Sequence, residues 1–497
     1  MEDSALSKLR QTELMGDSTP LSIVLAVVLG GVMLLSMKQL WSLYSASRAS
    51  KVDGARLPKG SFGWPIIGES FAFASNPKAY AQSRVKKYGG IFKSSLFLRP
   101  VILGATPEFA RFVTTNRKLF VHTLPDVLIN AMGPKSFISQ NGPYHMALKK
   151  IVSSAIGVES LQNHVQTLET IILENLGSWE RAGTVAALDA TQKLSWDASN
   201  WLLFNDRHTT STPEGKENFE NFKLIMRMVI NLPLKLPGTA YTVGMKARTA
   251  LMAYFRTLID ERRGSTEGVY FAALLAGRDD PDCREQLKDF DDNALAENIF
   301  LLNFTAHDTN STTLLWILKF LVDYPDVFRR LQAEQQEILN SKDRSVKGPR
   351  LTWEDTRKMV YTHKFLQELQ RFTSLVPANF AEATEDVKFG DYLIPKGWMV
   401  ITLTNVIHND PANYPDLSFN PDRFDVIPKP FTYLPFSGGP HMCPGIEFAK
   451  LVGCIFIHHI TTTYMHERAG RDKGLEYDGF FPRPKGGYPI NFRAGKL

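Results

Sequence analysis

The chain has 497 residues, of which 44% are hydrophobic and 22% are charged. This composition supports a large buried core and excludes an intrinsically disordered chain. The formal net charge of +6 comes from dispersed Lys and Arg residues. A nucleic-acid-binding protein would instead concentrate them in runs with interleaved aromatic residues. We therefore expect a folded protein with no nucleic-acid partner.

The N-terminal segment predicts a membrane anchor, because residues 21–44 are strongly apolar and carry the interfacial aromatic residues Trp41 and Tyr44 near their end. Acidic residues dominate before the segment and basic residues follow it, which places the C-terminal bulk in the cytosol. A cleaved signal peptide is the alternative, but such a peptide has a basic start. We predict a lumenal N-terminus over residues 1–20 and an uncleaved transmembrane helix over residues 21–44.

The next segment, residues 45–70, predicts a linker and a stiff hinge, because Pro58, Pro65 and several glycines cannot continue a helix. No Ser/Gly-rich linker divides the chain after this point. We predict one large catalytic domain over residues 71–497.

The pattern of this domain is mainly helical, since most of residues 75–340 has apolar residues at helical spacing. Strand-like pieces are short and lie near the two ends of the domain, at residues 91–97, 101–103, 387–389, 399–403 and 488–492. The expected fold class is mainly α (α+β), with a small β region. No GxGxxG follows a predicted strand, so no nicotinamide or flavin fold is encoded. Redox chemistry would therefore need electrons from another protein.

One long helix is predicted over residues 291–324, before Pro325, and its centre (NFTAHDTN, 303–310) is polar within an otherwise apolar element. A threonine such as Thr309 can simply hydrogen-bond to the preceding turn and bend the helix. Two further pairs share helix faces: His145 with Lys149, and Glu368 with Arg371.

The cysteines are sparse: Cys283, Cys443 and Cys454. An odd, sparse set does not build a disulfide framework and fits a reducing compartment. A lone cysteine is usually a small core residue, but Cys443 lies in the segment FSGGPHMCPG (436–445), directly before a predicted helix. Free N–H groups at a helix start stabilise a thiolate, and a soft thiolate is a ligand for iron.

This segment carries a family resemblance. The pattern Phe436-x-x-Gly439-x-x-x-Cys443-x-Gly445 resembles the haem-binding signature of cytochrome P-450 enzymes. The resemblance implies haem b as cofactor, Cys443 as the axial ligand of its iron, and the other signature residues around the haem. The family usually has Arg where this chain has His441, a group expected to meet a haem propionate.

The same resemblance extends to the charged helix pairs. Glu368 and Arg371 look like the ExxR pair of the family, and Arg423 in FNPDRF matches the arginine that joins it. This implies a buried network that supports the fold; a solvated surface pair is the alternative. His145 and Lys149 resemble the family's WxxxR or HxxxR helix, which implies that both reach a propionate. Lys provides a point charge where Arg would provide a fork.

Asp308 and Thr309 match the family's oxygen-activation motif, with Ala306 in place of Gly and with Thr305 and Asn310 as departures. The resemblance implies that Thr309 hydrogen-bonds dioxygen and that Asp308 delivers protons through water.

A further departure from the family pattern lies at Ala381. Relatives read FREA, with an arginine that is expected to meet a haem propionate. This chain reads Phe380-Ala381-Glu382-Ala383. We expect the missing cation to weaken haem retention unless His441, His145 and Lys149 suffice. The expected remedy is Ala381→Arg, which should raise haem occupancy.

Over residues 55–497 the chain resembles the plant group of abscisic acid 8′-hydroxylases, brassinosteroid oxidases and taxane hydroxylases. Relatives carry lysines in the segment that corresponds to residues 121–132, whereas VHTLPDVLINAM has no Lys or Arg. Burying an unpaired carboxylate is costly, so we expect a less acidic substrate, such as a neutral terpenoid or sterol.

The sequence thus predicts a haem-thiolate monooxygenase of the endoplasmic reticulum membrane with a cytosolic catalytic domain. It would hydroxylate a lipophilic isoprenoid (terpenoid, sterol or abscisic acid-like) with O2 and electrons from an NADPH-dependent reductase. Two alternatives stay open. One is a haem-thiolate isomerase or lyase that needs no external electrons, although such enzymes dispense with the acid–Thr pair. The other is a non-catalytic haem-binding protein.

Overall fold

The computed structural model describes residues 54–64, 67–204, 212–229, 231, 233–263, 269–342, 350–478 and 481–495, together with residues 30–33, 36–37 and 40. The predicted lumenal segment 1–20 and most of the predicted anchor 21–44 lie outside these residues. Among the described residues, no helix is both long enough and apolar enough to cross a bilayer.

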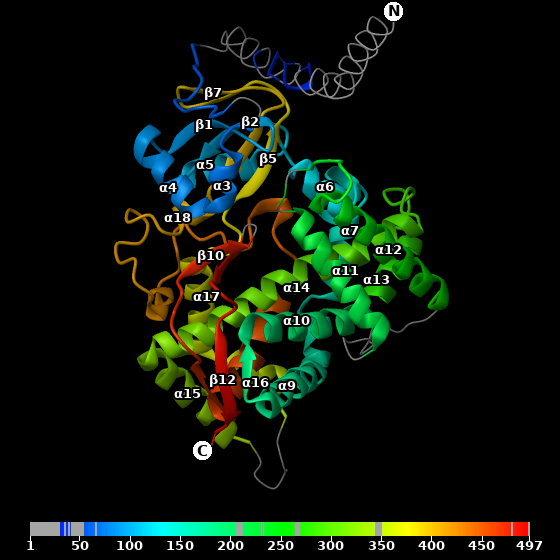
Figure 1. Cartoon of the computed structure of the whole chain (residues 1–497), viewed down its shortest axis with the longest axis vertical. Helices are drawn as coiled ribbons and strands as arrows, with labels where there is room; N and C mark the ends of the chain where they lie inside the picture. Colours follow the sequence, from blue (N-terminus) through cyan, green and yellow to red (C-terminus); the bar gives the residue numbers. More distant parts are fainter. Residues whose placement is uncertain are drawn as a thin grey trace, which may run out of the picture.

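Helices dominate the described chain, as predicted (Figure 1). They are α3 (Ser70–Ser75), α4 (Pro77–Tyr88), α5 (Pro107–Thr115), α6 (Asp126–Met132), α7 (Gly142–Ala155), α8 (Val158–Leu161), α9 (Val165–Ala182), α10 (Ala187–Phe204), α11 (Pro213–Val229), α12 (Ala240–Glu261), α13 (Val269–Asp279), α14 (Asp292–Asp323), α15 (Pro325–Asn340), α16 (Trp353–Lys358), α17 (Val360–Thr373), α18 (Thr404–Ile407) and α19 (Ile446–Thr462). Short 3-10 turns cover Phe137–Ser139, Gln162–His164, Pro421–Asp425 and Gly439–His441.

The described strands form small sheets, the largest of which has the order β1-β2-β8-β5-β3. Strands β2 and β8 are parallel, and the other neighbours in this sheet are antiparallel. The remaining sheets have the orders β4-β12-β9, β10-β11 and β6-β7. The strands are β1 (Ile91–Leu96), β2 (Arg99–Gly104), β3 (Phe120–His122), β4 (Thr184–Ala186), β5 (Asn379–Ala383), β6 (Val387–Phe389), β7 (Tyr392–Ile394), β8 (Met399–Thr402), β9 (Tyr464–Arg468), β10 (Leu475–Asp478), β11 (Phe481–Pro484) and β12 (Pro489–Ala494).

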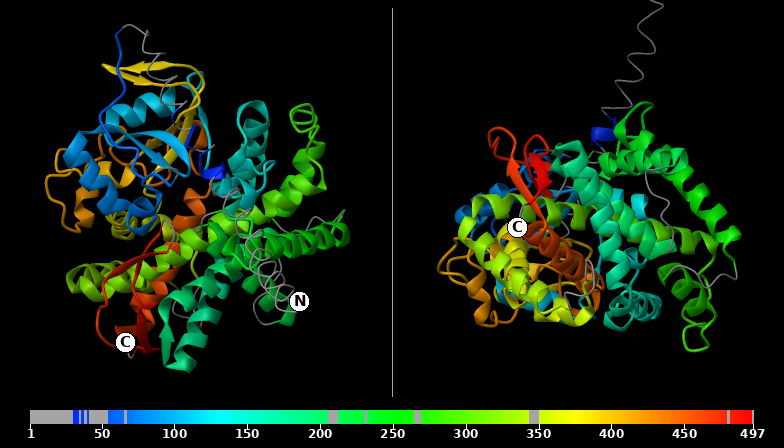
Figure 2. Two further views of the ribbon diagram at one scale, coloured as in Figure 1. Left: turned by 45° about the horizontal axis from the view of Figure 1, so that its top comes forward. Right: turned by 90° about the horizontal axis from the view of Figure 1, so that it is seen from below.

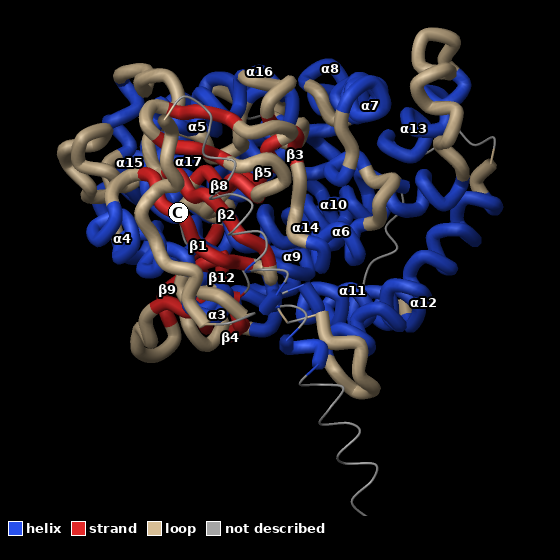
Figure 3. Tube along the Cα trace, turned by 90° about the horizontal axis from the view of Figure 1, so that it is seen from above, coloured by secondary structure: helices blue, strands red, loops and turns tan. Residues whose placement is uncertain are grey.

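The strands and helices are spatially separated. Figure 3 shows the strands, in red, on one side of the molecule and helices α11, α12 and α13 on the other. The predicted strands are confirmed as β1, β2, β6, β8 and β12. Strand β5 (NFAEA) was not predicted, because its residues do not alternate cleanly between apolar and polar. Its strand conformation is stabilised by pairing with β3 and β8.

Helix α14 runs through the centre of the helical part. Asp291 caps its first turn by accepting from the Ala294 N–H, and Pro325 follows its end. Its side chains are buried on nearly all sides, which is the pattern of a core helix. Helix α10 packs along α14, and α19 packs against α9, α14, α15 and α17. Figure 2 shows α19, in orange, among these helices.

The predicted hinge is described in part, and its C-terminal portion lies against the sheets. Arg56 bridges to Tyr392, and Gly60 bridges to Lys93. A Cβ on Gly60 would lie 2.0 Å from the Lys93 carbonyl oxygen, so this close approach requires glycine. Residues 56–60 are therefore held against strands β7 and β1.

Candidate active site

A cavity of about 610 Å³ lies where α14, the loop before α19 and the segment before β5 meet. Thr309 and Asp308 line it from α14, and Phe436 and Cys443 line it from the loop. Much of the remaining wall is apolar and includes Leu124, Leu128, Met132, Phe137, Ile138, Val152, Ile156, Leu301, Leu302, Phe304 and Val376. The predicted cysteine and the predicted acid–Thr pair therefore face one apolar space.

The loop that carries Cys443 is held by its own backbone. The Cys443 N–H donates to the Phe436 carbonyl at 3.0 Å, and the Gly445 N–H donates to the Cys443 Sγ at 3.4 Å. Gly439 has φ +65°, and a Cβ there would lie 3.0 Å from the Thr114 carbonyl oxygen. Glycine at this position lets the loop pass close to α5.

Burial raises the pKa of the Cys443 thiol, while the Gly445 N–H and the Lys149 charge lower it. The N–H group at the helix start therefore lowers the thiol pKa, as predicted, but in the protein alone burial raises this pKa by more. A coordinating metal removes a thiol proton outright.

Helix α7 brings both predicted residues to this loop. His145 is 1% exposed, and its ring stacks on His441 with centroids 3.9 Å apart. Lys149 Nζ donates to the Pro440 carbonyl. The i, i+4 spacing predicted that these two side chains share a face, and both contact the cysteine loop.

The polar centre of α14 contains the threonine back-bond that the sequence allows, and next to it a buried ion pair. Thr309 Oγ1 donates to the Thr305 carbonyl at 2.7 Å, which is the back-bond of a helical threonine. Asp308 is 4% exposed and forms an ion pair with Arg483 of β11, whose Nε also donates to Thr312 Oγ1 at 3.3 Å. Arg483 was not predicted at this site, because β11 is distant from α14 in the chain and no local pattern connects the two.

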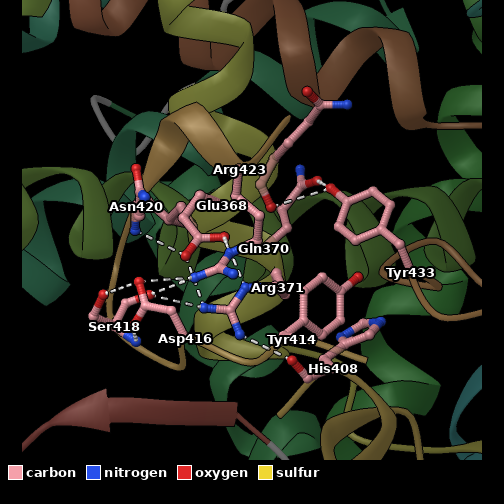
Figure 4. Close-up of polar contacts among 12 residues, drawn as sticks. Glu368, Gln370, Arg371, His408, Tyr414, Asp416, Ser418, Asn420, Arg423 and Tyr433 are labelled. Atoms are coloured by element: carbon pink, nitrogen blue, oxygen red, sulfur yellow. Dashed lines mark hydrogen bonds and ion pairs between the residues drawn. The ribbon is translucent and has the colours of Figure 1, made fainter. Parts of the chain in front are cut away.

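The Glu368–Arg371 pair is buried, not solvated (Figure 4). Both side chains are 0% exposed, and two Arg371 nitrogens reach the carboxylate at 2.7 Å. Arg423 approaches the same carboxylate at 3.4 Å. Arg371 also donates to the His408 carbonyl at 2.9 Å, and the Leu434 N–H donates to His408 Nε2 at 2.7 Å. The network thus connects α17 with the segment that enters the cysteine loop.

These residues fit an iron porphyrin. Among the described lining residues, Cys443 offers a thiol as a soft ligand, next to an apolar wall. The Nε2 atoms of His145 and His122 are buried and have no hydrogen-bond partner among the described residues. A protonated imidazole donates from such a nitrogen, which suits the carboxylates of the group.

The cavity lining contains basic side chains that residues 121–132 alone do not predict. The lining residues from this segment are His122, Leu124, Leu128 and Met132, none of them Lys or Arg. However, α11 contributes Lys223 and Arg227 to the same cavity. These cations were not predicted, because residues 121–132 are only one of the segments that line the cavity.

Comparisons with known proteins agree with this geometry. The family profile described as Cytochrome P450 matches residues 58–490. Abscisic acid 8′-hydroxylase 2 of Arabidopsis thaliana is 36% identical over 445 residues, which are 88% of this chain and 90% of the relative. Abscisic acid 8′-hydroxylase 1 of Oryza sativa subsp. japonica is 35% identical over 452 residues, 90% of this chain and 93% of the relative.

A solved structure, retinoic acid-bound cyanobacterial CYP120A1, superposes with a TM-score of 0.80 at 27% identity, covering 89% of this chain and 100% of the other. The helical fold with small sheets, the cavity beside Cys443 and the family match over most of the chain lead to one conclusion. The chain belongs to the cytochrome P450 family, as a haem monooxygenase related to the plant abscisic acid 8′-hydroxylases.

Proposed function

We propose that the chain hydroxylates a lipophilic isoprenoid, which is a terpenoid, a sterol or an abscisic acid-like molecule. The observation that carries the proposal is the cavity in which Cys443 and Thr309 face a largely apolar wall. An apolar wall buries a hydrocarbon skeleton favourably and leaves its orientation to a few polar groups.

The haem, when bound, supplies the activation of dioxygen with electrons from an NADPH-dependent reductase. Cys443 is the proposed axial ligand, since its thiol is at the described lining of the cavity. The other residues proposed to hold the haem are Phe436, Gly439, His441, Gly445, His145 and Lys149. Glu368, Arg371 and Arg423 support the loop from behind without touching the haem.

Proton delivery is proposed for the polar face of α14. Thr309 lines the cavity with its hydroxyl donating to the Thr305 carbonyl, and Asp308 holds the neighbouring carboxylate. Asp308 Oδ1 is paired with Arg483, and opening of the ion pair would free this oxygen to accept a proton from water. Arg483 is therefore proposed to position the carboxylate between turnovers.

The proposed location of the enzyme is the endoplasmic reticulum membrane. The apolar segment 21–44 would anchor the chain in the endoplasmic reticulum membrane, with residues 1–20 lumenal, residues 45–70 as linker and hinge, and residues 71–497 in the cytosol. The membrane, the reductase and the lipophilic substrate are the expected partners.

Replacement of Cys443 tests its assignment as the haem ligand. Cys443→Ser should abolish the thiolate-type Soret band of the reduced carbon monoxide complex, because serine does not replace the soft ligand. Cys454→Ser is the matched control, since Cys454 is buried in α19 away from the cavity lining. A thiolate-type band that survives in Cys443→Ser, or is lost in both variants, contradicts the assignment. Product formation should require both reductase and NADPH; turnover without them would identify an isomerase or lyase.

A carboxylated substrate is the second candidate, favoured by Lys223 and Arg227 at the cavity and by the names of the relatives. Type I binding spectra decide between the candidates. For a neutral substrate, uncharged isoprenoids bind more tightly than abscisic acid, and Lys223→Met leaves all affinities unchanged. Tight abscisic acid binding that Lys223→Met weakens, with its methyl ester unaffected, would establish the carboxylated class.

A further inference from the structure

Three imidazole rings form a stack beside the cysteine loop. His441 lies between His122 and His145, with ring centroids 4.4 Å and 3.9 Å away. Phe137 continues the stack on His145 at 4.6 Å. The three histidines come from β3, α7 and the loop, so only the tertiary fold brings them together.

The stack borders a second cavity of about 480 Å³, whose described lining contains the three histidines and Arg117 but no Asp or Glu. The buried Nε2 atoms of His122 and His145 have no hydrogen-bond partner among the described residues. No group of three His, Cys, Asp or Glu residues in the described chain fits a metal ion. Unpartnered imidazole nitrogens and a guanidinium, in a described lining that holds no carboxylate, fit an anion.

The strand register places His122 opposite Ala381, the position at which relatives have an arginine. His122 of β3 is the direct partner of Ala381 of β5, and directly opposite residues of an antiparallel pair project on the same face. Both line the second cavity. The imidazole of His122 therefore stands beside the methyl group of Ala381, which can neither donate a hydrogen bond nor carry a charge.

We propose that His122 binds a propionate carboxylate of the haem, together with His145 and His441, and so replaces the cation that Ala381 does not provide. This inference rests on the proposed haem site. The propionate is the favoured anion because His441 belongs to the loop that carries Cys443, and His122 and His441 line both cavities.

The chemistry of the ring agrees with this role. Burial lowers the pKa of His122 to about 4, and the ring meets the Phe380 backbone carbonyl. Without the anion the ring is neutral. A carboxylate at Nε2 favours the protonated form, and an imidazolium donates from both nitrogens.

The test measures haem loss from the haem-loaded full chain to excess apomyoglobin. His122→Phe keeps an aromatic ring in the stack and removes the donor, so haem loss should become about tenfold faster. His122→Gln keeps a donor and should lose haem at nearly the original rate. Adding Ala381→Arg to His122→Phe should restore slow loss, which a purely structural role of His122 would not produce.

Other outcomes are decisive against the proposal. Unchanged haem loss in His122→Phe, with a thiolate-type Soret band intact, overturns it and leaves the proposed function standing. If His122→Phe instead weakens type I binding of a carboxylated isoprenoid but not of its methyl ester, the anion is the substrate's and the propionate assignment is wrong. Absence of the thiolate band in the original chain contradicts the proposed function itself.

Discussion

At Asp308, the carboxylate that the sequence assigns to proton delivery is held in a buried ion pair with Arg483. Both side chains are almost fully buried. A buried pair is weak evidence for net stability, but breaking it leaves one uncompensated charge in the core. Through this pair, Arg483 ties strand β11 to the core around α14.

We expect Arg483→Gln to lower the free energy of unfolding by about 3–5 kcal/mol, because the Asp308 carboxylate then lies buried without its partner. Denaturant unfolding of the full chain measures the change. The double variant with Asp308→Asn removes the stranded charge, so it should be less destabilised than the sum of the two single variants. Additive effects would show that the two side chains do not interact.

The element that decides the geometry around Cys443 is the loop between β8 and α19. It passes α5 at Gly439, and its entering segment is tied to α17 through His408 and Arg371. Two adjacent glycines of this loop, Gly438 and Gly439, differ in backbone conformation. Gly438 has an extended φ of −156° and Gly439 a φ of +65°.

Gly439→Ala should therefore weaken the loop, because its Cβ would meet Thr114 at 2.9–3.0 Å in a backbone conformation that disfavours alanine. We expect a loss of roughly 1–3 kcal/mol in stability and a lower haem content. Thermal unfolding and the amplitude of the carbon monoxide difference spectrum measure both. Gly438→Ala is the matched control, since its nearest contact is 3.4 Å. Equal behaviour of the two variants would disprove the argument.

Across the whole molecule, buried neutral histidines lie far from one another along the chain. Burial lowers the pKa of His307, His408 and His458 to about 3 in each case, against 6.5 for an exposed histidine. Between these values the unfolded chain binds more protons than the folded one. Their contribution to stability is therefore present above pH 6.5 and is lost as the pH falls toward 3.

Stability should consequently fall on acidification from about pH 7.5 to about pH 5.5, by up to about 1.4 kcal/mol per pH unit for each such histidine below its unfolded pKa. The urea midpoint of unfolding measures this. Above about pH 7.5 the same groups contribute no slope, which serves as the internal control. A midpoint that does not change across the acidic range would exclude these histidines as buried neutral groups.

The sequence by itself determined the helical class, the long helix that contains Thr309, and the shared faces of Glu368 with Arg371 and His145 with Lys149. These follow from spacings of three and four residues, which covalent geometry translates directly into a helix face. The Cys443 loop was predictable for the same local reason, since its glycines, prolines and cysteine are consecutive.

Only the tertiary structure placed Arg483 on Asp308, Lys223 at the cavity, and His122 beside Ala381. Each of these contacts joins segments separated by many residues, and each depends on a strand register or on helix packing that no local pattern encodes. The physical reason is that burial of the whole core, not the preference of either segment, selects which distant side chains meet.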